Sequence, residues 1–67
     1  MKKEFIVPDM TCGHCVKTIT ATIHEFAPDA TVVADTDTHW LTIEAEQIEV
    51  QEIMMKLQAA GFSPQLA

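Results

Sequence analysis

One pattern of apolar spacing, typical of an amphipathic helix, occurs in two segments and constrains the fold more than any other feature. Apolar residues recur at spacings of three, four and three in two segments, which places them on one face of a helix. The first set is Val16, Ile19, Ile23 and Phe26, and the second is Val50, Ile53, Leu57 and Ala60. We therefore predict one helix that begins at Gly13 and ends before Pro28, and a second that ends at Gly61.

Short β-prone runs flank both predicted helices. The four runs are Phe5-Ile6-Val7, Ala30 to Asp35, Trp40 to Glu44 and Phe62 to Leu66. Pro64 indicates an edge position for the last run, because proline cannot donate a hydrogen bond to a neighbouring strand. The polar turn Thr36-Asp37-Thr38 joins the two middle runs and predicts an antiparallel hairpin.

The order strand, helix, strand, strand, helix, strand predicts an α+β fold of the ferredoxin-like βαββαβ type. In this fold a four-stranded antiparallel sheet carries both helices on one face. We expect residues 1–67 to form a single domain, whose small size requires nearly every apolar side chain in one core. The predicted inward residues are Phe5, Val7, Val16, Ile19, Ile23, Val32, Ala34, Leu41, Ile43, Val50, Ile53 and Leu57.

The charge and hydropathy of the chain exclude several classes of function. Ten acidic residues against four basic residues give a net charge of −6, which leaves no basic stripe for nucleic acid. No apolar run reaches the roughly 18 residues of a membrane span, and the patch after Glu4 is too short for a signal peptide. We therefore expect a cytoplasmic protein that does not insert into membranes. Thiols stay reduced in that compartment, where a CxxC pair is more often catalytic or metal-binding than structural.

The segment Met10-Thr11-Cys12-Gly13-His14-Cys15 contains both cysteines and joins the first predicted strand to the first helix. The positive end of the helix dipole favours thiolate over thiol there. Thioredoxin-like redox folds need more elements than this chain has, and structural zinc needs four ligands. Two thiolates at an exposed loop instead suit a soft ion of low coordination, above all Cu(I). The pattern favours a soft-metal carrier over a small dithiol/disulfide oxidoreductase.

The chain resembles a heavy-metal-associated domain, close to small bacterial copper chaperones and to the N-terminal modules of copper-transporting P-type ATPases. The resemblance rests on the cysteine segment, on Val16 and Ile19, and on Ala60-Gly61-Phe62. It implies a carrier rather than an enzyme, with Cu(I) bound by Cys12 and Cys15 and passed on by ligand exchange. The implied partner is a copper-transporting ATPase or a copper-responsive regulator, and the implied states are a metal-free monomer and a metal-bridged homodimer.

The resemblance also assigns roles to other residues near the cysteines. Met10 is expected to pack under the loop in the core, and Gly13 to let the loop close around the ion. Phe62 is expected to shield the ion where many bacterial relatives have tyrosine. Zinc- and cadmium-selective relatives often carry Asp immediately before the first cysteine, and Thr11 at that position favours Cu(I) over Zn(II). A zinc-, cadmium- or mercury-binding module excised from a transport ATPase is the alternative.

The three histidines have different predicted roles. His14 lies between the cysteines and has two interpretations: an auxiliary ligand across a dimer that shares copper, or a solvated loop residue. We favour the second interpretation for the monomer. His24 and His39 show no ligand spacing with the cysteines, and we predict that both are surface residues.

Overall fold

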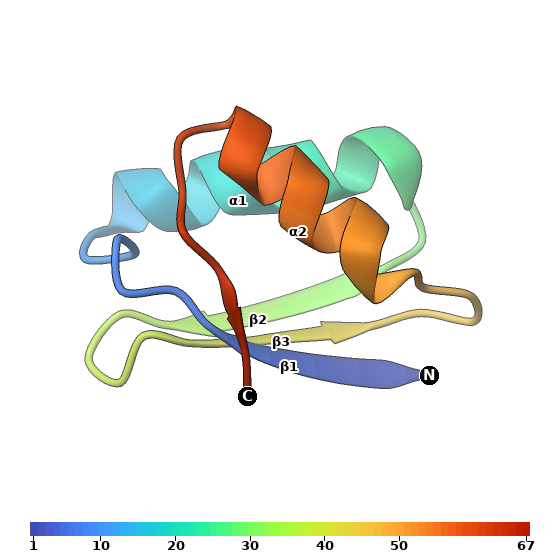
Figure 1. Ribbon diagram of the computed structural model, residues 1–67, viewed down its shortest axis with the longest axis horizontal. Coiled ribbons are helices and arrows are strands. Elements are labelled where there is room, and N and C mark those ends of the chain that lie inside the picture. Colours follow the sequence, from blue (N-terminus) through green and yellow to red (C-terminus); the bar gives the residue numbers. More distant parts are fainter.

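One antiparallel sheet carries both helices on the same face (Figure 1). The computed structural model describes residues 1–67 and contains the six predicted elements in the predicted order. They are β1 (Lys2–Ile6), α1 (Gly13–Phe26), β2 (Thr31–Asp35), β3 (Trp40–Glu44), α2 (Val50–Ala59) and β4 (Gln65–Leu66). The strands lie in the order β2-β3-β1-β4, and each pair of neighbours is antiparallel. This confirms the ferredoxin-like α+β fold.

The register of the sheet places apolar side chains in pairs beneath the helices. Phe5 in β1 lies opposite Leu41 in β3, and Ile43 lies opposite Val32 in β2. Because side chains alternate between the two faces of a strand, Trp40, which precedes Leu41 in β3, lies on the open face of the sheet. Its indole Nε1 donates a hydrogen bond to Oε1 of Glu4 at 3.4 Å, and 37% of the residue is exposed.

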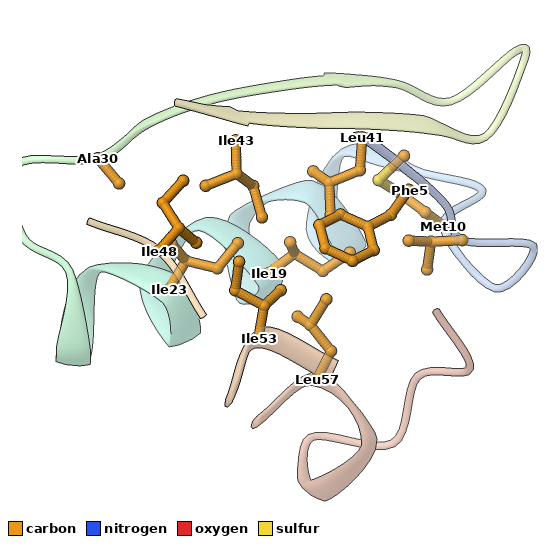
Figure 2. Close-up of a cluster of buried hydrophobic side chains, with 11 residues drawn as sticks. Phe5, Met10, Ile19, Ile23, Ala30, Leu41, Ile43, Ile48, Ile53 and Leu57 are labelled. Carbon is orange, nitrogen blue, oxygen red and sulfur yellow. The ribbon is translucent and has the colours of Figure 1, made fainter. Parts of the chain in front are cut away.

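Eleven buried apolar residues form one core between the sheet and the helices (Figure 2). They are Phe5, Val7, Met10, Ile19, Ile23, Ala30, Leu41, Ile43, Ile48, Ile53 and Leu57. Eight of the predicted inward residues are in this set, and the other four are half-buried against it: Val16, Val32, Ala34 and Val50. Ala30 and Ile48 were not in the predicted set. Ala30 continues the alternation of Val32 and Ala34 one position before β2 and was missed, whereas Ile48 lies in the connection between β3 and α2, where no periodicity indicates burial.

The C-terminal end of α2 differs by one residue from the prediction. Ala60 was assigned to the apolar face, but it caps the helix and is exposed. Gly61 follows with φ 97°, a conformation that glycine adopts without steric cost. The amides of Gly61 and Phe62 donate to the carbonyls of Gln58 and Leu57 at 3.0 and 2.9 Å. This pair of bonds is a Schellman motif, and it ends the helix at the predicted glycine.

Both terminal strands differ in extent from the prediction, since β1 begins at Lys2 and ends at Ile6, and β4 begins only at Gln65. The last strand contains only Gln65 and Leu66 and pairs with β1 alone, so the predicted edge position is confirmed. Val7 lies beyond the end of β1, but its amide still donates to the carbonyl of His39 at 2.8 Å. No helix combines the length and the apolar character that crossing a membrane requires.

This topology brings three connections to one end of the molecule (Figure 1). They are the loop from β1 to α1, the turn between β2 and β3, and the segment from α2 to β4. Both cysteines lie at this end, where the first of these loops enters the helix.

Candidate metal-binding site

The start of α1 brings the two thiols together. Cys12 is the N-cap residue with extended backbone angles, and its carbonyl accepts the amide of Val16 at 3.2 Å. Cys15 lies in the first turn of the helix, three residues later, and residues at this spacing lie on the same side of a helix. The two Sγ atoms are 3.4 Å apart. The CxxC spacing and the helix start are therefore sufficient to make the thiols converge.

The loop has an exposed end and a buried base. Cys12 is exposed and Cys15 is half-buried, with its side chain packed against the core. Met10 is completely buried, as predicted, at the end of the core that contains Phe5 and Leu41 (Figure 2). Its amide donates to the carbonyl of Val7 at 3.0 Å. The chain is thus fixed at Met10 and reaches solvent at the next residue, Thr11.

The electrostatic environment of Cys12 favours its thiolate. The backbone amide of Cys15 is the largest cause of a lowered pKa of the Cys12 thiol, followed by the Cys15 side chain and the backbone amide of His14. No acidic residue lies in the first turn of α1 to oppose this effect. Free amides at a helix N-terminus stabilise negative charge in this way. Cys12 is therefore suited to act as a nucleophile or as a metal ligand.

The lowered pKa of Cys12 predicts how its alkylation depends on pH. The thiolate is the reactive species, so the rate of reaction with iodoacetamide rises as pH passes through the pKa. Because folding lowers that pKa, we expect the midpoint for Cys12 in the folded, metal-free chain at a lower pH than in the same chain unfolded by guanidinium. Site-resolved mass spectrometry measures both midpoints. Equal midpoints would show that the helix start does not stabilise the thiolate.

The sulfur separation is close to that required by one shared ion. With metal–sulfur bonds of about 2.3 Å, two sulfurs lie about 3.8 Å apart around a tetrahedral ion and about 4.6 Å apart around a linearly coordinated ion. From the observed 3.4 Å, the sulfurs must separate by about 0.4 to 1.2 Å to hold an ion. Thr11 and Cys12 are exposed, so a shift of this size can take place there without displacing the buried Met10.

Three other residues are predicted to belong to the site, namely His14, Phe62 and Gly13. His14 is exposed on α1, and its carbonyl accepts the hydroxyl of Thr18 at 3.1 Å. The chain contains no group of three or more His, Cys, Asp or Glu side chains that could hold a metal ion. Phe62 lies in the segment from α2 to β4 and is half-buried against the core. Gly13 is the first residue of α1 and does not have a positive φ.

The predicted surface position is confirmed for His24 and wrong for His39. His24 is exposed, with Nε2 2.9 Å from the carbonyl oxygen of Ala30. His39 is half-buried, and its Nδ1 lies 3.1 Å from the carbonyl oxygen of Met10. The sequence carried no signal for this contact, because 29 residues separate the two partners and only the folded hairpin brings them together.

Residues 4–63 match the family model of the heavy-metal-associated domain. The chain belongs to this family. Among solved structures, the gold binding protein has 35% sequence identity and a TM-score of 0.90, and the match covers 97% of this chain and 98% of that chain. A comparison with curated protein sequences gives no match.

Two other solved structures show the same fold at lower identity. The copper chaperone Atx1 from Synechocystis PCC6803 has 21% identity and a TM-score of 0.86, with 92% of this chain and 97% of that chain covered. The N-terminal domain of ZntA has 21% identity and a TM-score of 0.88, with 98% and 90% covered. This chain thus shares its fold with a gold binding protein and with a copper chaperone.

Proposed function

We propose that this heavy-metal-associated domain is a cytoplasmic Cu(I) carrier in which the thiolates of Cys12 and Cys15 hold the ion. The observation that carries the proposal is the 3.4 Å separation of the two sulfurs at an exposed helix start. Soft thiolates select Cu(I), and the lowered pKa of Cys12 makes its thiolate available at lower pH. The likeness in fold to a copper chaperone supports the same role for residues 1–67 acting as one domain.

Transfer of the ion follows from the unequal exposure of the two ligands. A thiolate of the partner approaches the ion from the exposed side and replaces Cys12, while the half-buried Cys15 still holds the ion. A second partner thiolate then replaces Cys15, and the ion leaves without any change in oxidation state. The recipient on this proposal is a copper-transporting P-type ATPase or a copper-responsive regulator, and the carrier performs no catalytic turnover.

An anaerobic titration tests whether the chain binds Cu(I) and by which chemistry. In competition with a Cu(I)-specific chelator, we expect one tightly bound ion per chain. Binding displaces thiol protons, so the apparent affinity should increase with pH and level off once both sulfurs are ionised. An affinity that does not change across the range of thiol titration would contradict thiolate ligation.

Size-exclusion chromatography of the loaded sample shows whether two chains share the ion, with the exposed His14 as an additional ligand candidate.

Au(I) and Zn(II) are the competing metals in the same experiment. The 35% identity to the gold binding protein favours Au(I) as the second candidate, because both ions are soft and monovalent. We expect Cu(I) to displace Zn(II) completely, since two thiolates leave a tetrahedral ion half coordinated. Retention of Zn(II) against an equal concentration of Cu(I) would support the alternative of a zinc- or cadmium-binding module.

A dithiol/disulfide oxidoreductase is the alternative of a different class. The low pKa of Cys12 and the neighbouring sulfur of Cys15 also suit thiol–disulfide exchange. This alternative requires repeated reduction of a disulfide substrate by the metal-free chain in the presence of a reductant. We expect no turnover above that of an unstructured peptide with the same CxxC segment. Turnover together with weak Cu(I) binding would replace the carrier proposal.

A further inference from the structure

A closed cycle of three hydrogen bonds joins the turn between β2 and β3 to the base of the cysteine loop. The carbonyl of His39 accepts the amide of Val7 at 2.8 Å, and the carbonyl of Val7 accepts the amide of Met10 at 3.0 Å. The ring Nδ1 of His39 completes the cycle at 3.1 Å from the carbonyl oxygen of Met10. A carbonyl oxygen can only accept, so Nδ1 carries the proton in this contact.

The backbone of His39 indicates that its side chain matters at this position. Its φ is 62°, in the left-handed region, and no other residue except glycine has a positive φ in this chain. Glycine would adopt this conformation without steric cost, and asparagine tolerates it well. Histidine brings to the turn a ring donor that reaches a residue 29 positions earlier in the sequence. Neither the turn nor the sheet requires that donor.

We propose that His39 is a positioning residue for the two thiols. The carbonyl of Met10 belongs to the peptide unit that leads into Thr11, so holding this oxygen fixes the direction in which the chain leaves the core toward Cys12. The buried Met10 side chain anchors the same residue from the other side. The loop is therefore held at its base from two directions, and the opening needed to admit an ion is confined to Thr11, Cys12 and Gly13.

This inference rests on the proposed metal binding. On this inference, the contact of His39 with Met10 holds the loop in its binding conformation before the ion arrives. The apparent affinity of a loop for its ligand is the intrinsic affinity multiplied by the fraction of the time that the loop spends in its binding-competent conformation. Loss of the ring hydrogen bond should therefore weaken Cu(I) binding although His39 does not touch the ion. Because one hydrogen bond contributes a net factor of roughly three to ten in an equilibrium, we expect a change of about this size.

Two variants of His39 separate the ring donor from the shape of the turn. His39→Asn retains an N–H donor near the position of Nδ1 and tolerates the positive φ. His39→Gly removes the donor and accepts the positive φ without strain. We expect the dissociation constant for Cu(I), measured anaerobically by chelator competition, to stay within about twofold of wild type for His39→Asn. For His39→Gly we expect it to rise about three- to tenfold.

A second readout distinguishes positioning from a general loss of stability. We measure hydrogen exchange of the Met10 amide, which donates to the carbonyl of Val7 in the same cycle, by NMR in the metal-free chains, together with the melting temperature. Positioning predicts about three- to tenfold faster exchange at this amide in His39→Gly than in His39→Asn, with melting temperatures within a few degrees of each other. Equal Cu(I) affinity in the two variants would overturn the inference and leave the proposed function intact.

Failure of the proposed function gives a different result. If wild type itself does not bind Cu(I) in competition with the chelator, the carrier proposal is wrong. The exchange of the Met10 amide then decides whether His39 holds the loop, because that measurement requires no metal. Equal exchange in the two variants would overturn the positioning role in that case as well.

Discussion

Replacing either Cys12 or Cys15 by serine is expected to abolish tight Cu(I) binding. The two sulfurs are 3.4 Å apart and are the two thiolate ligands that the proposal assigns to the ion. Four-ligand zinc sites bind with apparent free energies of about 10–16 kcal/mol, so one ligand contributes roughly 3 kcal/mol and its loss weakens binding at least ~10²-fold. Serine keeps the size of the side chain but supplies no soft donor at neutral pH. Anaerobic chelator competition measures the loss.

The matched control is Met55→Ser, which removes a sulfur from an exposed position on the other helix. We expect this variant to bind one Cu(I) per chain with the wild-type affinity. Circular dichroism and melting temperature should be similar for all three variants, because Cys12 is exposed and Cys15 only half-buried. Tight binding that survives replacement of both cysteines would place the metal elsewhere in the chain.

Truncation of Phe5 to alanine is expected to have the largest effect on stability. Its ring is completely buried in the central strand β1, opposite Leu41 and Leu66 of the two neighbouring strands. Phe→Ala changes in cores cost about 3–5 kcal/mol. A single core in a chain below about 70–80 residues rarely supplies more than about 3–5 kcal/mol of stability, so the variant should be close to unfolded at 25 °C. Urea unfolding followed by circular dichroism measures the difference.

Val33→Ala is the control for Phe5→Ala. Val33 is 60% exposed in β2, and its neighbours in the strand, Val32 and Ala34, pack against the core. Its truncation removes apolar atoms from the open face of the sheet. We expect the free energy of unfolding to change by no more than about 0.5 kcal/mol. Comparable losses in the two variants would mean that both faces of the sheet are covered in solution.

The apolar periodicity of the sequence predicted both helices, but two buried residues at or beyond the ends of the predicted segments were missed. Both helices were predicted because each packs one face on the sheet, and this requirement produces the three-four-three spacing of apolar residues. Ile48 lies in the connection between β3 and α2, outside any periodic segment, so no local pattern predicts its burial. Ala30 shares the alternation of Val32 and Ala34, and its burial could have been predicted from that pattern. Ala60 continued the pattern by chance, although the Schellman motif at Gly61 ends the helix before it.

The candidate site could be predicted because its two thiols are local in sequence. Cys12 and Cys15 converge through the geometry of one helix start, which a spacing of three residues is sufficient to indicate. The burial of Met10 under the loop was predicted from the resemblance to the family and is confirmed. The contact of His39 with Met10 depends on how the β2–β3 hairpin folds against the loop, and no local pattern encodes it.

X-ray absorption at the copper edge of the Cu(I)-loaded chain tests the proposed site most directly. We expect a first coordination shell of sulfur that fits two thiolates per ion and requires no nitrogen neighbour, with His14 remaining in solvent. The same measurement on the Cys12→Ser variant should show that this two-sulfur shell is lost. A shell dominated by nitrogen, or a sulfur shell unchanged by the Cys12 substitution, would contradict binding of the ion by Cys12 and Cys15.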